Sequence, residues 1–546
     1  MRGSEGAAAP RSGGGRSVEA LFARYGPTYR WFVTGTALMG TLATVLSSTI
    51  ANVALPEVMG AFGIGQDQAQ LISAGFLAAT TGTMLLNAWL VESFGFRTVF
   101  AVVIGLFALS SVTAGLAPNA GALIASRVLQ GACAGVLQPM SMQIIFAVFP
   151  PERRGAAMGL YAMGVVLAPA FGPSIGGLLV DDWGWRFVFL LGVPFTLLGL
   201  GLGLVFMPGR QAEGAIRRFD WLGFALLAVA LSTLLGGLSS GQRVGWGSDS
   251  VVFALSIAAA AWVAFFAWEM TTAAPLLNPR VFAERGFGAS ALTSVIYGAG
   301  MFGSTYLIPL FVQLVQGYTA TRAGLLLMPA GLIAGVVFPI AGRLSDKMPG
   351  WKLIVFGLTV FAVSCWLMAG GDTDTPFWTF AIWTMIGRAG MGFAMPSINA
   401  GALRALPQRL LAQGAGAISF TRMLGGAVGV TLLSVLLEQR TQVHAEALAA
   451  TQHPGNPATM EALRLIEGLL AQDGLPETLR RAGAEDFLGR MITAQANMLG
   501  FRDTFLALAL VFAVALIPGL MTQRRPPIPT GAAPGAAPPP GPPPPP

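Results

Sequence analysis

Between residues 31 and 436 the sequence is one apolar run after another, each about 20 residues long and nearly free of charge. A run of about 20 apolar residues is what an α-helix needs to cross the hydrocarbon core of a bilayer. Only 10% of the 546 residues are charged, whereas a soluble domain carries about 25%. Too few polar side chains remain to cover a water-facing surface, so we expect an all-α polytopic membrane protein.

Fourteen such runs predict fourteen transmembrane helices. They lie at 31–53, 70–91, 98–117, 121–147, 155–180, 187–207, 221–240, 250–269, 288–313, 322–342, 353–371, 377–399, 411–436 and 503–522. An even number of spans puts both termini on one side of the membrane. Most of the 32 Lys and Arg residues fall in the termini and the alternate loops on that side. Because cytoplasmic loops are enriched in Lys and Arg, we expect both termini to be cytoplasmic in a bacterial inner (plasma) membrane.

Three segments outside the spans have their own composition. Residues 1–30 are rich in Gly, Ala and Arg, lack the features of a cleavable signal peptide, and are predicted to be a disordered cytoplasmic N-terminus. Residues 523–546 form a Pro-rich cytoplasmic tail. Residues 438–502 are predicted to be a long periplasmic loop, amphipathic in pattern, which either docks a periplasmic adaptor or stays mobile.

The two ends of the chain repeat each other. After the second and the tenth span, a Leu is followed two residues later by an acid, Glu92 or Asp346, and then by Gly and a basic residue. Arg127 and Arg388, each with a Gly four residues on, are a second echo. The repeat predicts two six-helix bundles, residues 31–207 and 288–522, with two inserted transmembrane helices in 208–287, and it predicts alternating access between the bundles.

The repeated loops predict a cytoplasmic latch. Asp346 near a helix terminus can accept hydrogen bonds from backbone amides and pair with a nearby Arg or Lys. Lys347 belongs to the same loop, and Glu92 and Arg97 belong to its copy, in which Ser93 follows the acid. A solvated charged loop is the alternative interpretation.

Several ordered motifs carry a resemblance to a known family. The fourth span contains Arg127-Val-Leu-Gln130-Gly, and the fifth contains Ala-Pro169-Ala-Phe-Gly172-Pro173-Ser-Ile-Gly176-Gly177. The first span ends Thr-Ile-Ala-Asn52-Val-Ala-Leu-Pro, and the thirteenth contains Arg422-Met-Leu-Gly-Gly. These strings resemble the major facilitator superfamily, specifically its fourteen-helix drug:proton antiporter branch (EmrB/QacA-like). The resemblance covers residues 30–522.

The resemblance implies a secondary active transporter that exports small amphipathic compounds by proton antiport. It assigns proton coupling and transport to four residues: Arg127, Gln130, Ser47 and Asn52. It assigns the antiporter motif, which limits leak between the halves, to Pro169, Gly172, Pro173, Gly176 and Gly177. From the residues alone, Arg127 could instead only tie its helix to neighbouring carbonyl groups, and the Gly-rich stretch could be an ordinary packing seam.

One departure from the family pattern affects the mechanism. The branch has an aspartate in the first span, in the pattern Leu-Asp-x-Thr, where this chain has Ser47. None of the 25 acidic residues lies centrally in a predicted span, and serine does not titrate at neutral pH. Three alternatives follow: a loop-end acid such as Glu57 or Asp181 folds inward, or coupling uses Arg127 with water and the substrate's own charge, or transport is not driven by protons.

Two further arginines within predicted spans indicate which substrate charge is favoured. Arg388 and Arg422 lie near the middle of their spans and are candidate cavity residues. A cavity with three arginines and no deep acid favours neutral, zwitterionic or anionic amphiphiles over strongly cationic ones.

Other classes of function have less support. Cys133, Cys365, His444 and His453 lack metal-ligand spacing, and the chain has no nucleophile or ATP-binding motif, so we expect no enzyme activity, no metal, no cofactor and no nucleic-acid partner. The partners expected are a small amphipathic substrate, protons and the lipid bilayer. A dedicated exporter of one metabolite, lipid or siderophore would share these motifs, and a non-transporting membrane receptor on a transporter fold is a further alternative.

Overall fold

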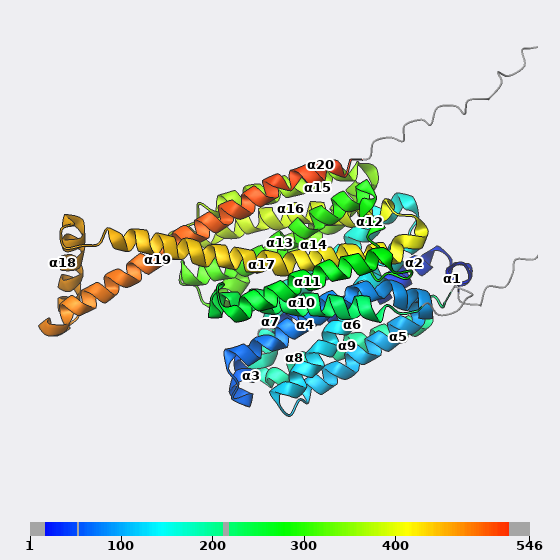
Figure 1. Ribbon diagram of the computed structural model, residues 1–546, viewed down its shortest axis with the longest axis horizontal. Coiled ribbons are helices and arrows are strands. Elements are labelled where there is room, and N and C mark those ends of the chain that lie inside the picture. Colours follow the sequence, from blue (N-terminus) through cyan, green and yellow to red (C-terminus); the bar gives the residue numbers. More distant parts are fainter. Residues whose placement is uncertain (1–16, 52–53, 211–217, 524–546) are drawn as a thin grey trace, which may run out of the picture.

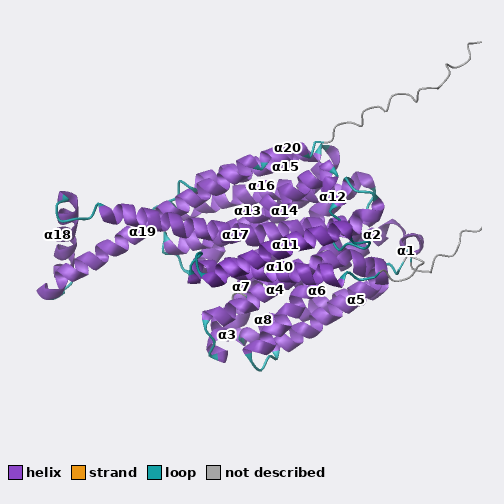
Figure 2. Cartoon of the chain, in the orientation of Figure 1, coloured by secondary structure: helices purple, strands orange, loops and turns teal. Residues whose placement is uncertain are grey.

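The computed structural model describes residues 17–51, 54–210 and 218–523, and the secondary structure of this part of the chain is helical throughout (Figure 1, Figure 2). Within these described residues, eleven segments are long and apolar enough to cross a membrane. One of them, Leu71–Gly115, holds two spans, because Gly95 has a φ of 79° and breaks the helical geometry there. Two long helices, α7 (Arg154–Trp183) and α16 (Phe377–Arg404), add two more. The predicted fold class, with fourteen transmembrane helices, is confirmed.

The first six-helix bundle follows the predicted spans closely. It comprises α2 (Tyr29–Ile50), α4 (Gln66–Thr83) with η2 (Met84–Leu86), α5 (Asn87–Gly115), α6 (Ala120–Val148), α7 (Arg154–Trp183), α8 (Trp185–Leu190) and α9 (Gly192–Phe206). The short α3 (Leu55–Phe62) and η3 (Pro151–Arg153) lie in its connections. Gly95 forms the turn between the second and third spans. The turn needs a positive φ, which would strain any residue with a Cβ, so glycine is the favoured residue here.

The second bundle is built in the same way. It comprises α13 (Arg285–Leu314), α14 (Ala320–Lys347), α15 (Gly350–Met368), α16 (Phe377–Arg404), α17 (Leu411–Ala450) and α19 (Glu477–Val514) with α20 (Leu516–Met521). Two short helices, α12 (Arg280–Ala283) and η4 (Gln408–Leu410), lie in its connections.

The two bundles share one packing plan. In the first, α2 packs against α6, α7 and α9, and α5 and α4 pack against α6. In the second, the equivalent α13 packs against α16, α17 and α19, and α15 and α14 pack against α16. Contacts between the bundles obey the same symmetry, because α7 packs on α14 and α17 packs on η2. The repeat read from the loops is therefore a repeat of structure.

The inserted helices α10 (Trp221–Val244) and α11 (Asp249–Thr271) pack mainly on each other. They lie across the seam between the bundles (Figure 1). Leu231 of α10 lies against Gly82 of α4, and the Trp262 ring of α11 lies 6.2 Å from the Phe420 ring of α17. The insertion therefore contacts both halves.

Two expectations from the sequence are wrong. Residues 17–30, predicted to be disordered, form α1 (Val18–Tyr25) and η1 (Gly26–Thr28) and enter α2, because Ser17 caps α1 and Tyr25 and Phe22 pack against Tyr29. Residues 1–16 and 524–546, which hold most of the two predicted tails, lie outside the described residues.

The stretch 438–502 is not a loop. Helices α17 and α19 continue beyond the bundle, and α18 (Pro457–Gln472) joins them (Figure 1). Leu463 and Ile466 of α18 pack against Ala484 of α19 in a small core of their own. We call residues 438–502 the extension. The end of the molecule that carries it is the extension face, and the opposite end, with residues 92–97, 149–154, 345–352 and 404–410, is the basic face.

Candidate functional site: buried arginines and the contact between the bundles

Arg127 of α6 is fully buried and is held by uncharged groups of three helices. Its Nη1 donates to Ser47 Oγ (3.1 Å) and Ser47 O (3.2 Å) of α2 and to Gln130 Oε1 (2.9 Å). Its Nε lies 3.4 Å from Ile72 O of α4, and the guanidinium lies 4.2 Å from the Phe76 ring centre. Gln130 Nε2 then donates to Ser111 Oγ of α5. Ser47, Gln130 and Arg127, which the resemblance groups together, are thus in direct contact.

Within the described residues Arg127 has no carboxylate partner, and its Nη2 is buried without a hydrogen-bond acceptor. A buried charge without a counter-charge is costly, by several kcal/mol in real proteins. Cation–π contact with Phe76 offsets part of this cost. Asn52, the fourth residue predicted for this group, lies outside the described residues.

The antiporter motif lies in α7, which runs beside α2. Gly172 is buried, and a Cβ there would lie 2.5 Å from Thr49 Oγ1 of α2, so a small residue is required for the two helices to meet. Gly176, one turn on, is also buried. Pro169, Pro173 and Gly177 belong to the same helix, and their side-chain surroundings are not among the described features.

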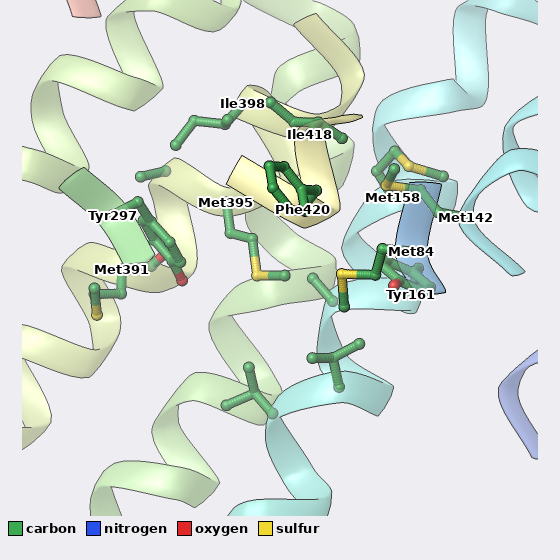
Figure 3. Close-up of a cluster of buried hydrophobic side chains, with 14 of the residues drawn as sticks. Met84, Met142, Met158, Tyr161, Tyr297, Met391, Met395, Ile398, Ile418 and Phe420 are labelled. Carbon is green, nitrogen blue, oxygen red and sulfur yellow. The ribbon is translucent and has the colours of Figure 1, made fainter. Parts of the chain in front are cut away.

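A buried cluster of methionines and aromatic rings joins the two bundles at their centre (Figure 3). The first bundle contributes Met84, Met142, Met158 and Tyr161, and the second contributes Tyr297, Met391, Met395, Ile398, Ile418 and Phe420. Methionine is flexible and polarisable and adapts to differently shaped apolar partners. The sequence does not reveal this cluster, because its five methionines lie in four elements, η2, α6, α7 and α16, and leave no local pattern.

Arg422 of α17 is buried beside this cluster. Its Nη1 lies 3.4 Å from Asn399 Oδ1 of α16, and its guanidinium interacts with the Tyr161 hydroxyl of α7 in the other bundle. Arg388 of α16 is less buried and donates from Nη2 to Thr305 Oγ1 of α13 at 2.7 Å. In the described part of the chain neither arginine has an ion pair. Arg422 thus lies where the bundles meet, whereas the hydrogen bond of Arg388 lies within the second bundle.

Asp346 connects the two bundles at the basic face. Its Oδ1 and Oδ2 accept hydrogen bonds from Gly155 N (2.6 Å) and Ala156 N (2.8 Å), in the first turn of α7. Arg404 of α16 donates to Oδ1 at 2.8 Å. A carboxylate at a helix N-terminus is favoured by the free amides and the helix dipole. Arg404, which the sequence analysis did not single out, completes this arrangement.

The other predicted latch residues take different positions. Lys347 is exposed, and the backbone N–H of Arg97 donates to Pro208 O at 2.9 Å. Glu92 lines a cavity of about 490 Å³ at the seam, together with Gln413 of α17. Here Asn87 Nδ2 lies 3.4 Å from Ala412 O, a weaker contact than the Asp346 group makes.

Glycines bring α7 and α14 into direct backbone contact. A Cβ at Gly159 of α7 would lie 2.5 Å from Phe338 O of α14, and one at Gly342 of α14 would lie 2.5 Å from Gly155 O. The basic face is therefore closed between the bundles.

Comparison with known proteins assigns this architecture. The sequence model of the Major Facilitator Superfamily matches residues 37–430. The chain belongs to the major facilitator superfamily. It is 30% identical over 503 residues to the multidrug export protein EmrB of Escherichia coli K12, covering 91% of this chain and 96% of that one. It is 28% identical over 492 residues to the fatty acid resistance protein FarB of Neisseria gonorrhoeae, covering 89% and 94%. These relatives place it in the EmrB-like branch.

Solved structures agree on the fold of this major facilitator protein. The human organic anion transporter MFSD10 superposes with a TM-score of 0.56 at 14% identity, covering 88% of this chain and 99% of that one. The proton:xylose symporter XylE superposes with a TM-score of 0.55 at 14% identity, covering 77% and 91%. At this identity the likeness concerns the fold.

Proposed function

We propose that the protein is a secondary active transporter that exports small amphipathic compounds, neutral or anionic, by proton antiport and alternating access. The observation that carries the proposal is Arg422, a buried cation between two bundles, beside an adaptable methionine cluster and without a carboxylate partner in the described chain. Relatives named for multidrug export and for fatty acid resistance support it.

The preference for anions follows from charge. Burying an ion without a counter-charge is unfavourable, so a cavity that contains Arg422 and Arg388 but no acid would bind a carboxylate more readily than an ammonium group. An apolar chain would fill the space among the methionines once the bundles separate.

The direction of closure supports alternating access. Asp346, Gly155 and Gly342 hold the basic face shut, and we take that face to be the cytoplasmic one, with both termini there and the protein in a bacterial inner membrane. Breaking these contacts would open the central cluster to the cytoplasm. Asp346 and Arg404 act as the latch.

The extension is the surface proposed for a periplasmic adaptor. Leu465, Leu469, Leu479, Phe487 and Met491 are exposed on its helices. Leu465 and Leu469 lie one turn apart on α18, and Phe487 and Met491 lie one turn apart on α19. Neighbouring exposed apolar side chains are typical of an interaction site, and a stiff helical projection would hold them away from the membrane.

Proteoliposomes with an imposed pH gradient test the function. We expect a long-chain carboxylate to evoke proton flux and an apolar cation of similar size to evoke much less. Arg422→Gln should reduce carboxylate transport by roughly tenfold or more, as expected for loss of about 1.4 kcal/mol or more of binding energy, and Arg422→Lys should keep part of it. Carboxylate movement without proton flux would reject antiport, and no movement of any compound would favour the receptor alternative.

A further inference from the structure

Two carboxylates of the inserted helices lie together in the described structure, 49 positions apart in sequence. Asp220 precedes α10 and is 8% exposed, and Glu269 lies in the last turn of α11 and is 2% exposed. The ideal Cβ position of Gly223 is 2.5 Å from Asp220 Oδ2 and 2.7 Å from Glu269 Oε1. Asp220 Oδ2 and Glu269 Oε1 therefore lie close together, on either side of the position that a Cβ at Gly223 would occupy.

Three of the four oxygens have hydrogen-bond donors. Asp220 accepts from Gly223 N (2.8 Å) and from Trp268 Nε1 (2.9 Å to Oδ1 and 3.0 Å to Oδ2). Glu269 Oε2 accepts from Leu277 N (3.1 Å). Glu269 Oε1 is buried and accepts no well-formed hydrogen bond in the described chain, although the Leu276 N–H also lies near this carboxylate. Oε1 lies near Asp220 Oδ2, since both oxygens approach the Cβ position of Gly223, and an ionised oxygen here would be close to a second negative charge.

The surroundings do not supply a cation at close range. Neither acid forms an ion pair within the described residues. Four charged groups line the adjoining 490 Å³ cavity with Asp220: Glu92 of α5, Arg280 of α12, Glu284 before α13, and Arg409 of η4. Arg280, Glu284 and Arg409 are exposed. Two adjacent buried carboxylates without a close cation cannot both ionise at low cost, and sharing one proton removes the repulsion.

We propose that Asp220 and Glu269 form a proton-binding site, in which the proton resides on Glu269 Oε1 and faces Asp220. This site deepens the proposed antiport and rests on it for its role in transport, since it supplies the acid that position 47 lacks. Proton binding itself does not depend on transport.

The position of the site links it to the movement of the bundles. Ala88 and Trp89 of the first bundle and Pro407 and Leu410 of the second form walls of the same cavity. Separation of the bundles at the basic face would pull these walls apart and admit water to Asp220. The proton would then exchange with that side in one state and be enclosed in the other.

Infrared spectroscopy of the purified full-length protein tests proton binding directly. We expect the C=O stretch of a protonated carboxyl group at neutral pH in the wild type. Glu269→Gln should remove this band. The matched control Glu284→Gln, which changes an exposed carboxylate lining the same cavity, should keep it. In Asp220→Asn the neighbouring charge is gone, so the pH at which the band disappears should fall.

Each outcome decides the proposal. Absence of the band in the wild type, or its persistence in Glu269→Gln, would overturn it. If Glu269→Gln does not fold, an unchanged titration in Asp220→Asn would overturn it equally. A band that behaves as expected in a protein that moves no protons would keep the site and reject the antiport of the preceding section.

Discussion

At position 47 one side chain determines whether Arg127 has a counter-charge. Ser47 Oγ lies 3.1 Å from Arg127 Nη1, so Ser47→Asp would place a carboxylate beside a fully buried cation. Hydrogen bonds to charged groups contribute about 1.5–3 kcal/mol. We expect a higher melting temperature and a steeper pH dependence of transport, because the new pair can titrate. Ser48→Asp, with the same charge on a different side of α2, should lower the melting temperature; equal effects of the two variants would show that Arg127 is not involved.

Asp346 is a second single residue whose role can be tested by mutation, because it connects the two bundles at the basic face. Asp346→Asn removes the charge that binds two amides of α7 and Arg404. We expect the equilibrium to shift by about 1–2 kcal/mol, or roughly 5–30-fold, toward a state open at the basic face. Distance measurements between spin labels on α7 and α14 would report it. Lys347→Ala alters the exposed neighbour and should change nothing; a shift of the same size there would mean that the loop acts through its net charge.

At the scale of elements, close approach of α7 and α14 depends on glycine. Gly159→Ala would put a methyl group 2.5 Å from Phe338 O, and backbone cannot move aside as a side chain can. We expect the basic face to close less often and transport to fall several-fold, while folding is retained. Gly105→Ala in α5 meets nothing within 4 Å and should slightly stabilise the protein, by about 0.5–1 kcal/mol. The labelling rate of a cysteine introduced at the α7–α14 contact would distinguish the two variants: it should rise in Gly159→Ala and stay unchanged in Gly105→Ala.

Some helices and contacts could be predicted from the sequence, and others could not. Spans are set by apolar length, so the bundles and the inserted pair were predictable. The Asp220–Glu269 pair was also predictable, because consecutive antiparallel helices place the start of α10 beside the end of α11. In the sequence, however, each acid lies at the end of a span, and nothing local marks the two as a pair. The extension was missed because its helices are amphipathic and polar, and their stability comes from α18 packing on α19. Arg404 joined Asp346 only through tertiary packing of α14 on α16.

On the scale of the whole molecule, the chain enters the extension through α17 and leaves it through α19. At its base Asp503 Oδ2 accepts from Arg440 Nε (2.6 Å) and lies 2.7 Å from His444 Nε2, and Gly500 packs against Thr441. These contacts hold the two helices together below α18. Removing residues 446–496 and joining the helices by a short Gly/Ser turn, as in an ordinary helical hairpin, would leave this base intact.

The shortened protein separates transport from assembly. Because the central cluster and Asp346 lie away from the extension, substrate flux in proteoliposomes should stay within about twofold of the wild type, a change of less than about 0.5 kcal/mol in the barrier. Export from whole cells should be lost if a periplasmic adaptor binds the extension, since the compound would no longer reach the outside. Leu465→Ser with Leu469→Ser, which removes exposed apolar contacts but keeps α18, should give the same division between the two assays. Loss of flux in proteoliposomes would instead make the extension part of the transporting machinery, and full export from cells would exclude an adaptor on this surface.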